Sequence, residues 1–309
     1  MILTVTLNPA VDKTYTTGEL ITGHVNRMRT AMSIAGGKGV NVTKVLRQYD
    51  CPVCATGFLG GYAGAFIEDY LQSEDVKCKF IRVEGETRSN MNILADNGYV
   101  TEILEPGPEI SDEKLQNFLI QYEDMLSECE LVILSGSLAR GLPDDIYAVL
   151  IEKAKSKGIR TILDTSGEAL RKGINAKPYM IKPNQKELEY IIGHKLVKRE
   201  AVKEAALFLH EKGIEYVVVS MGKKGLILAC NGKAYFASAA KVSVLNTVGC
   251  GDSVVASFAM SILKNENDKQ ALIQAVAISA ANATTIISAY IPRETAQELA
   301  EHIKIEELK

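Results

Sequence analysis

The chain has 309 residues, of which 47% are hydrophobic and 24% charged, and its formal net charge is −3 at pH 7. This length suits one large α/β domain with an appendage, and the composition is that of a globular protein with a substantial core. The slight acidic excess argues against non-specific nucleic-acid binding, and every apolar run is interrupted before it reaches membrane-spanning length.

The chain begins with "MILTVTLNPAVDKT", which has no basic leader and no cleavage site and therefore predicts a first strand and not a signal peptide. Further along, "TYTTGEL", "NRMRTAMSIA" and "SNMNILADNGYVTEILEPG" predict more strands, the last two-stranded with a turn at Asn97-Gly98. Together they predict a small antiparallel element among the first βα units. Such a sheet cannot bury both faces, so we expect it to cover a ligand cleft, another subunit, or both.

A glycine-rich loop, "SIAGGKGVNVTKVLRQY", precedes a predicted helix with Val42, Val45 and Leu46 on one face. Glycines allow a ligand to approach the backbone closely, and free amides at a helix start favour an anion. The spacing matches neither a Walker A loop nor a dinucleotide fingerprint. An anion-binding loop and a plain tight turn are both compatible with this stretch.

The six cysteines, at positions 51, 54, 78, 129, 230 and 250, are too scattered for a disulfide framework. "CPVC" at 51–54 is a lone CxxC without a second pair or a histidine at ligand spacing. We therefore expect free thiols, no zinc site, and a cytoplasmic protein.

From about residue 130, the apolar runs "LVILSGS", "TILDTSG", "YMIKPN" and "YVVVSMG" alternate with helical patterns. This rhythm predicts βα units around a parallel sheet that is buried on both faces. Ligands of such sheets bind beyond the carboxyl ends of the strands. Those ends carry residues 135–137, 164–167, 182–184 and 220–222, all polar or glycine-containing. The sequence therefore predicts one shared site there.

The stretch "LNTVGCGDSVVASFAMSIL" at 245–263 predicts a flexible turn followed by a helix from about Asp252. The first amides of a helix have no intrahelical partner, and they stabilise negative charge such as that of a phosphoryl group in transfer. Asp252 beside them could accept the proton of an attacking hydroxyl. The alternative is that Asp252 only caps the helix.

The stretches "AGGKGVNV", "SGSLARGLP", "DTSGEAL", "KPNQKEL", "VVVSMGKKG" and "NTVGCGDSVVAS" resemble, in this order, the ribokinase/PfkB carbohydrate kinase family. The resemblance covers essentially the whole chain, and "VGCGDS" is similar to the specific "GAGD" signature of the family. "LTVTLNPAVD", "GETRSNMNIL" and "TEILEPGPEI" resemble the phosphosugar branch, the 1-phosphofructokinases and tagatose-6-phosphate kinases.

The resemblance implies a single ribokinase-like domain over 1–309, with a three-layer α/β/α core, a mainly parallel sheet, and a small β-sheet lid from segments near 12–35 and 87–105. It also implies site residues. Asp252 would be the catalytic base, and the amides of Gly249, Cys250 and Gly251 an anion hole. The sugar hydroxyls would bind to Asp12, Gly37 and Asn41, and the existing phosphate to Lys38, Arg88 and Ser137. The nucleotide would bind to Lys182, Asn184, Ser220, Gly222, Thr247 and Asn282, with Glu187 near the metal.

We therefore expect an ATP- and Mg²⁺-dependent kinase that converts a ketohexose phosphate into a bisphosphate. The sequence does not separate tagatose 6-phosphate, fructose 1-phosphate and fructose 6-phosphate. A substrate phosphate requires cations, which Lys38 and Arg88 supply.

The alternatives are a kinase of an unphosphorylated sugar or nucleoside, a non-catalytic sugar-phosphate sensor, and a nucleotide-cofactor oxidoreductase, which the missing fingerprint disfavours. A homodimer through the lid follows from the resemblance alone. Potassium activation stays open, because "IISAYIP" at 286–292 lacks the glycine usual in that loop of the family.

Overall fold

The central sheet of the computed structural model, which describes all residues 1–309, has ten strands in the order β14-β13-β12-β11-β10-β9-β8-β1-β4-β5. From β11 to β5 neighbouring strands are parallel, whereas β12, β13 and β14 add antiparallel pairs at one end. The strands are β1 (Ile2–Thr6), β4 (Val53–Leu59), β5 (Lys77–Arg82), β8 (Leu131–Ser135), β9 (Arg160–Asp164), β10 (Met180–Ile181), β11 (Tyr216–Ser220), β12 (Leu226–Cys230), β13 (Lys233–Ala237) and β14 (Ile305–Leu308).

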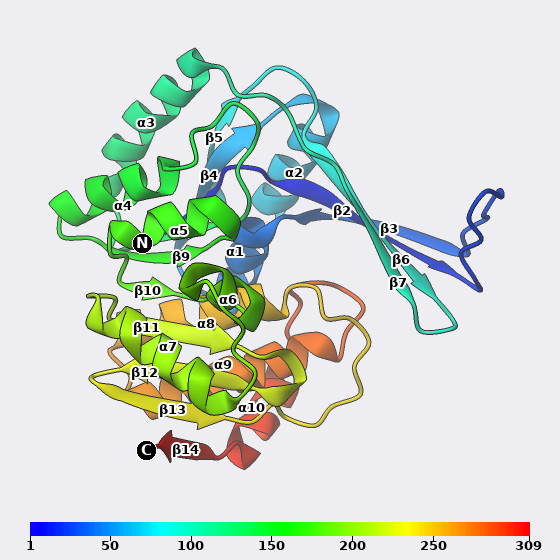
Figure 1. Cartoon of the computed structure of the whole chain (residues 1–309). Coiled ribbons are helices and arrows are strands. Elements are labelled where there is room, and N and C mark those ends of the chain that lie inside the picture. Colours follow the sequence, from blue (N-terminus) through cyan, green and yellow to red (C-terminus); the bar gives the residue numbers. More distant parts are fainter.

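Helices cover both faces of this sheet (Figure 1). One face packs against α1 (Lys38–Gln48), α2 (Gly61–Ser73), α8 (Cys250–Lys264), α9 (Asp268–Ala283) and α10 (Arg293–His302). The other packs against α3 (Asp112–Leu126), α4 (Ile146–Ser156), α5 (Gly167–Asn175), α6 (Gln185–Ile192) and α7 (Arg199–Glu211). Because side chains alternate along a strand, Leu131 and Ile133 enter the first core while Val132 and Leu134 enter the second. The predicted three-layer α/β/α architecture with a mainly parallel sheet is confirmed.

A separate four-stranded sheet, here called the small sheet, has the order β3-β2-β6-β7. Its strands are β2 (Ala10–Thr17), β3 (Thr30–Gly36), β6 (Arg88–Ala95) and β7 (Val100–Leu104). The predicted turn at Asn97-Gly98 does join β6 and β7, and Gly98 has the positive φ of 84° that such a turn requires. Both outer pairs are antiparallel, whereas the middle pair, β2 with β6, is parallel and joins two separate hairpins.

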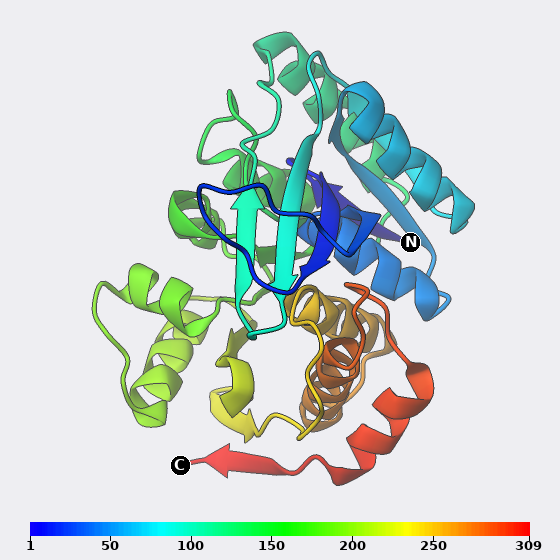
Figure 2. The same ribbon diagram turned by 90° about the vertical axis from the view of Figure 1, so that its right-hand side faces the viewer.

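The small sheet projects from the edge of the central sheet at which the parallel strands end, as Figures 1 and 2 show. Two features explain this position. Only three residues separate the end of β1 from the start of β2, so β2 leaves from the carboxyl edge. An exposed ion pair of 2.6 Å between Arg29 and Asp96 then joins the outer parts of the two hairpins. None of the helices combines the length and the hydropathy that crossing a bilayer requires.

Candidate active site

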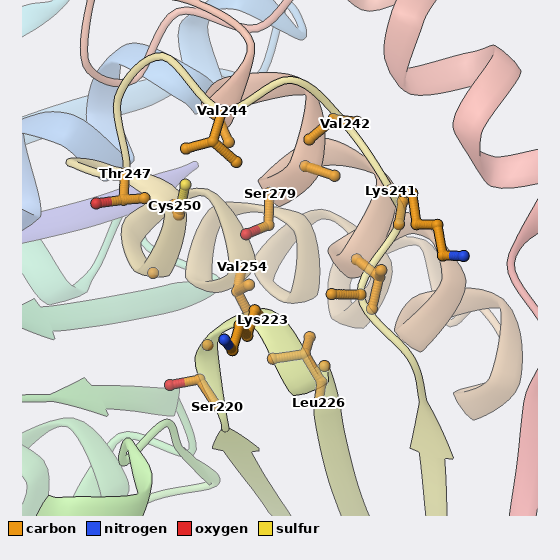
Figure 3. A pocket seen from close by; sticks show the side chains of 18 residues that line it. Ser220, Lys223, Leu226, Lys241, Val242, Val244, Thr247, Cys250, Val254 and Ser279 are labelled. Carbon is orange, nitrogen blue, oxygen red and sulfur yellow. The ribbon is translucent and has the colours of Figure 1, made fainter. Parts of the chain in front are cut away.

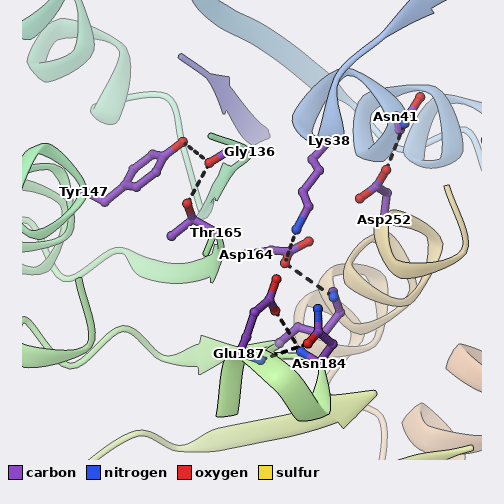
Figure 4. Close-up of polar contacts among 10 residues, drawn as sticks. Lys38, Asn41, Gly136, Tyr147, Asp164, Thr165, Asn184, Glu187 and Asp252 are labelled. Atoms are coloured by element: carbon purple, nitrogen blue, oxygen red, sulfur yellow. Dashed lines mark hydrogen bonds and ion pairs between the residues drawn. The ribbon is translucent and has the colours of Figure 1, made fainter. Parts of the chain in front are cut away.

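Three charged residues from separate elements meet at the carboxyl edge of the sheet. Asp164 ends β9, Lys182 follows β10, and Lys38 begins α1. Asp164 Oδ1 accepts from Lys38 Nζ at 3.1 Å and lies 3.4 Å from Lys182 Nζ. Burial alone would raise the pKa of the Asp164 carboxyl, but the ammonium groups of Lys182 and Lys38 outweigh it and lower this pKa. Asp164 therefore stays ionised between two cations (Figure 4).

Asp252 lies in the first turn of α8, which begins at Cys250, two residues earlier than predicted. Its side chain makes no capping bond, so the alternative of a plain helix cap does not describe this carboxylate. Instead, Oδ2 of the buried Asp252 accepts a hydrogen bond of 2.9 Å from Nδ2 of Asn41 (Figure 4). Helix α1, through Asn41, thus holds the carboxylate of Asp252 on α8.

The carboxyl group of Asp252 titrates near neutrality. Burial and then the charge of Asp164 raise its pKa to about 6, against the opposing influence of Lys38, Asn41 and Lys182. A carboxylate with such a pKa is deprotonated at neutral pH and still basic enough to accept a proton.

The turn before α8 presents free backbone donors. Within the chain, the amides of Gly249, Gly251 and Asp252 have no hydrogen-bond acceptor, whereas the amide of Cys250 donates to the Thr247 carbonyl at 3.3 Å. Two of the three predicted anion-hole amides are therefore free, and the Asp252 amide adds a third. Since Gly251 has no side chain, Lys182 Nζ can approach within 3.3 Å of the place a Cβ would take.

Asn282, which we expected at the nucleotide, supports this turn from behind. It is buried, and Nδ2 donates to the Val248 carbonyl at 2.9 Å and to Cys250 Sγ at 3.3 Å, while Oδ1 accepts from the Ala289 amide at 2.8 Å. Its side chain does not line the cavity described next. Its contacts support the backbone of the turn, and a role of Asn282 at the nucleotide stays a prediction.

A cavity of about 560 Å³ opens beside the turn (Figure 3). Its lining includes Ser220, Gly222 and Thr247, all predicted for the nucleotide, together with Cys250 and Gly251. The rest of the wall is largely aliphatic, with Leu226, Val242, Val244, Val254 and Val276. Such a cavity suits a flat apolar ring system, with its few polar groups near the turn.

Asn184 and Glu187 form a capping box at the start of α6. Asn184 Oδ1 accepts from the Glu187 amide at 2.9 Å, and Glu187 Oε2 accepts from the Asn184 amide at 2.8 Å. Asn184 also lines a neighbouring cavity of about 530 Å³ with Ser220 and Gly222. Although burial opposes it, the charges of Asp164, Asp252 and Glu187 raise the pKa of Lys38. We had expected Lys38 beside the substrate phosphate; the structure places its ammonium group on Asp164.

Asp12 lies at the root of the small sheet. Its buried Oδ1 accepts from Asn90 Nδ2 at 2.9 Å, and burial raises the pKa of the Asp12 carboxyl. The carboxylate fills the space that a side chain on Gly36 would need, next to Gly37. Asn90 Oδ1 is buried and has no hydrogen-bond partner, so a free acceptor lies beside the carboxylate.

Arg88 and Ser137 come together through Asn8. The Asn8 carbonyl accepts from Arg88 Nη2 at 3.0 Å, and Asn8 Nδ2 donates to the Leu138 carbonyl at 3.2 Å and lies 3.5 Å from Ser137 Oγ. The loop that carries Ser137 is fixed at the Gly136 carbonyl, which accepts from Tyr147 and Thr165 at 3.0 and 2.8 Å (Figure 4). The guanidinium of Arg88 and the hydroxyl of Ser137 thus lie in one small polar region near Asp12.

The structure adds four residues to which the sequence assigned no role: Asn8, Lys44, Asn90 and Asp164. Asp164 was marked as the polar end of a predicted strand. The other three lie in quoted motifs, but most of their contacts are with residues far away in the sequence.

The carboxylate of Asp252, with its raised pKa, lies near free helix amides and two ammonium groups, and an apolar cavity opens beside them. This is the layout of a phosphoryl-transfer enzyme. A model of the pfkB family carbohydrate kinases matches residues 4–295. Among solved structures, a candidate phosphofructokinase from Staphylococcus aureus is 32% identical, with 100% of this chain and 99% of that one covered and a TM-score of 0.84. A candidate 1-phosphofructokinase from Thermotoga maritima is 27% identical over 100% and 99% of the chains, with a TM-score of 0.91. Phosphofructokinase-2 from Escherichia coli, in complex with potassium, is 25% identical over 97% and 98%, with a TM-score of 0.90.

The chain belongs to the pfkB family of carbohydrate kinases, in the branch of 1-phosphofructokinase and phosphofructokinase-2, and is an ATP-dependent sugar kinase. The ribokinase-like fold that the sequence predicted is that of these neighbours.

Proposed function

We propose that this kinase transfers the γ-phosphoryl group of ATP to a ketohexose phosphate, with Asp252 as the general base. The observation that supports this most is the position of the Asp252 carboxylate, which Asn41 holds at the start of α8 beside free amides and near Lys182 and Lys38. An acceptor hydroxyl there meets a base and an electropositive surface together.

The chemistry follows from these groups. Asp252 takes the proton of the acceptor hydroxyl as its oxygen attacks the γ-phosphorus in line, and the bond to the β-phosphate oxygen breaks, leaving ADP. The amides of Gly249, Gly251 and Asp252 donate to the negatively charged oxygens of the group in transfer. Lys38 and Lys182 lower the energy of the same charge, and closure of the small sheet as a lid excludes water.

The nucleotide base would occupy the cavity of about 560 Å³, with Ser220, Gly222 and Thr247 near its ribose and phosphates and with Lys182 and Asn184 toward the γ-phosphate. Asp164 Oδ2 is buried without a partner, and Glu187 uses only Oε2 in its cap, so two carboxylate oxygens remain free. Such hard oxygen donors fit Mg²⁺, and we assign Asp164 and Glu187 to hold it. When bound, the metal neutralises phosphate charge.

The acceptor side supports a substrate that already carries a phosphate. We assign the phosphate to Arg88 and Ser137, and the sugar hydroxyls to Asp12, Asn90 and Gly37. The similar solved structures are described as phosphofructokinases, which supports a ketohexose phosphate. Tagatose 6-phosphate, fructose 1-phosphate and fructose 6-phosphate are the candidates, and the motifs at 85–94 and 101–110 lean toward the first.

Potassium activation is compatible with the chain. Ala289 in the loop "IISAYIP" has a φ of 58°, so the left-handed position is kept although its glycine is missing. A similar phosphofructokinase-2 is described as a complex with potassium. Comparing turnover in potassium and in sodium salts decides the point.

Two measurements test the proposal. Asp252→Asn keeps the shape of the site but cannot take a proton, so we expect kcat to fall by about 10³-fold or more while ATP binding is retained. A panel of the three ketohexose phosphates, with free fructose and free tagatose, should give the highest kcat/KM with a phosphorylated sugar.

Near-normal kcat in Asp252→Asn would remove the base assignment. A preference for unphosphorylated sugars or nucleosides would overturn the substrate class. Tight sugar-phosphate binding without any turnover would establish a sensor.

A further inference from the structure

Lys44 is a buried cation in α1, one turn after Asn41, and its side chain contacts no carboxylate. Its Nζ donates to the carbonyls of Ser288 and Ala35, at 2.9 and 3.2 Å, and to Asn41 Oδ1 at 3.4 Å. A buried charge without an ion pair is costly, so its other contacts bear on why it is present.

The contact with Asn41 sets the orientation of that amide. Asn41 has one accepting and one donating end. Since Oδ1 faces the Lys44 ammonium, Nδ2 faces Asp252 Oδ2, at 2.9 Å. In the reversed orientation the amide NH₂ would face the ammonium and its oxygen would face the carboxylate, and both contacts would be repulsive. A positive charge at Lys44 therefore keeps a donor on Asp252.

The contact with Ser288 connects Lys44 to the turn that precedes Asp252 through a second set of hydrogen bonds. Ser288 precedes Ala289, whose amide donates to Asn282 Oδ1 at 2.8 Å, and Asn282 in turn holds the Val248 carbonyl just before the helix that carries Asp252. Lys44 thus ties α1 to the loop that supports the anion-binding turn.

We propose that Lys44 is a positioning residue for Asp252, which acts through the orientation of Asn41 and requires its ammonium form. This rests on the proposed role of Asp252 as the base. Nothing in the contacts of Lys44 gives it a direct place on either substrate.

The surroundings of Lys44 define a pH dependence. Burial lowers its pKa to about 8, although Asp12 on β2, Asp252 on α8 and Glu74 at the end of α2 attract the charged form. The ring of Tyr70 on α2 lies 5.8 Å from Nζ. Above about pH 8 the ammonium loses its charge, so Asn41 is no longer held and kcat declines as the pH rises.

The first test compares Lys44→Met with Lys44→Arg. Loss of the charge is expected to reduce kcat by about 10- to 100-fold, because small misplacement of a reacting group has effects of this size. The KM for ATP should stay within about twofold, and Lys44→Arg should recover most of the turnover. Lys203→Met is the matched control, since Lys203 is similarly buried but bonds Glu200 and the Lys309 carbonyl far from the site. It should keep normal kinetics.

The pH profile of kcat separates positioning from loss of structure. In Lys44→Met, we expect the acid limb set by Asp252 to move to higher pH and the alkaline limb to disappear. Asn41→Ala provides a second test that does not depend on whether Lys44→Met folds. It should also lack the alkaline limb, because the connection between the two groups is cut.

Normal kcat in Lys44→Met, or an unchanged alkaline limb in Asn41→Ala, overturns the inference. If Asp252→Asn is inactive at the same time, only the inference fails, and the proposed base stands. If Asp252→Asn is active, the proposed function itself fails.

Discussion

Asp252 is held in a charge state that its surroundings disfavour. Its pKa of about 6 lies above the ordinary value of 3.8, so between these two pH values the folded protein keeps a proton that the unfolded chain releases. The free energy of unfolding therefore decreases as the pH rises through this window, and the full loss is present above about pH 6. The shift corresponds to roughly 3 kcal/mol of stability lost to keep the carboxylate ionised in the site.

Replacing Asp252 by Asn should therefore stabilise the protein at pH 8 by up to about 3 kcal/mol, and the gain should vanish near pH 3.5. Urea unfolding at both pH values measures it. Asp164→Asn is the control of opposite sign, because the pKa of Asp164 is lowered by two lysines and its charge stabilises the fold. A loss of stability in Asp252→Asn at pH 8 would contradict this account of the carboxyl group.

The sequence predicted those site residues that lie in a recognisable local pattern. Asp252 follows two glycines at a helix start, and Asp12, Lys38 and Arg88 lie in motifs. The contacts of Lys44 with Ser288 and of Asn90 with Asp12 could not be predicted, because the partners are 244 and 78 residues away. The contact of Lys44 with Asn41 is local, but nothing in the sequence shows that a lysine on this helix is buried. The contacts of Asn282 with Val248, Cys250 and Ala289 depend on packing that no local pattern encodes.

Individual elements of the fold depend on a few close approaches between backbones. Gly57 in β4 pairs with Thr6 of β1 and has a φ of 144°, and a Cβ there would overlap the Thr6 carbonyl. Strand β1 leads directly to Asn8 and the small sheet, so this approach also fixes the start of the small sheet.

We expect Gly57→Ala to lower the free energy of unfolding by about 3 kcal/mol, because backbone must move against backbone. Gly193→Ala is the matched control: Gly193 also has a positive φ, of 86°, but open space surrounds it. It should lose only about 1 kcal/mol. Denaturant unfolding compares the two variants, and equal losses would show that conformation alone, and not the overlap, sets the effect.

The elements themselves were largely predictable, because continuous apolar runs followed by turn residues mark parallel strands. The start of α8 was predicted two residues late, since Gly249 in a left-handed conformation, and not Asp252, takes the N-cap. The parallel pairing of β2 with β6 was not predictable, because two hairpins far apart in the sequence can meet in either direction.

The whole molecule exposes apolar side chains on the small sheet. Tyr99, Val100 and Ile103 lie on or beside the edge strand β7 and are 74%, 58% and 48% exposed. This exposed apolar strand is the surface that the homodimer expected from the sequence would bury, and the homodimer stays a prediction.

Ile103→Glu would place a charge on that strand and should shift the protein toward monomers by at least about tenfold in Kd, measured by light scattering during size-exclusion chromatography. Val197→Glu is the matched control, because Val197 is 81% exposed but lies in the segment between α6 and α7. It should leave assembly unchanged. A wild-type protein that stays monomeric at every concentration would rule out the dimer.

At this scale the sequence predicted the family and the layered architecture, since ordered motifs span the chain. It could not predict which sugar fits, because differences in hydroxyl stereochemistry are resolved only by the shape of a pocket made from several distant segments.

The proposed acceptor and nucleotide regions come from separate parts of the chain. The first is built by β2, β6 and the start of α1, and the second by η1 (Gly222–Lys224), β12 and the helices α8 and α9. Lys38, which bonds Asp164, and Asn41, which bonds Asp252, connect the start of α1 with the rest of the site. Mutations can therefore accumulate in one region without disturbing the other. The specificity for the sugar can thus change during evolution while the specificity for the phosphate donor is kept.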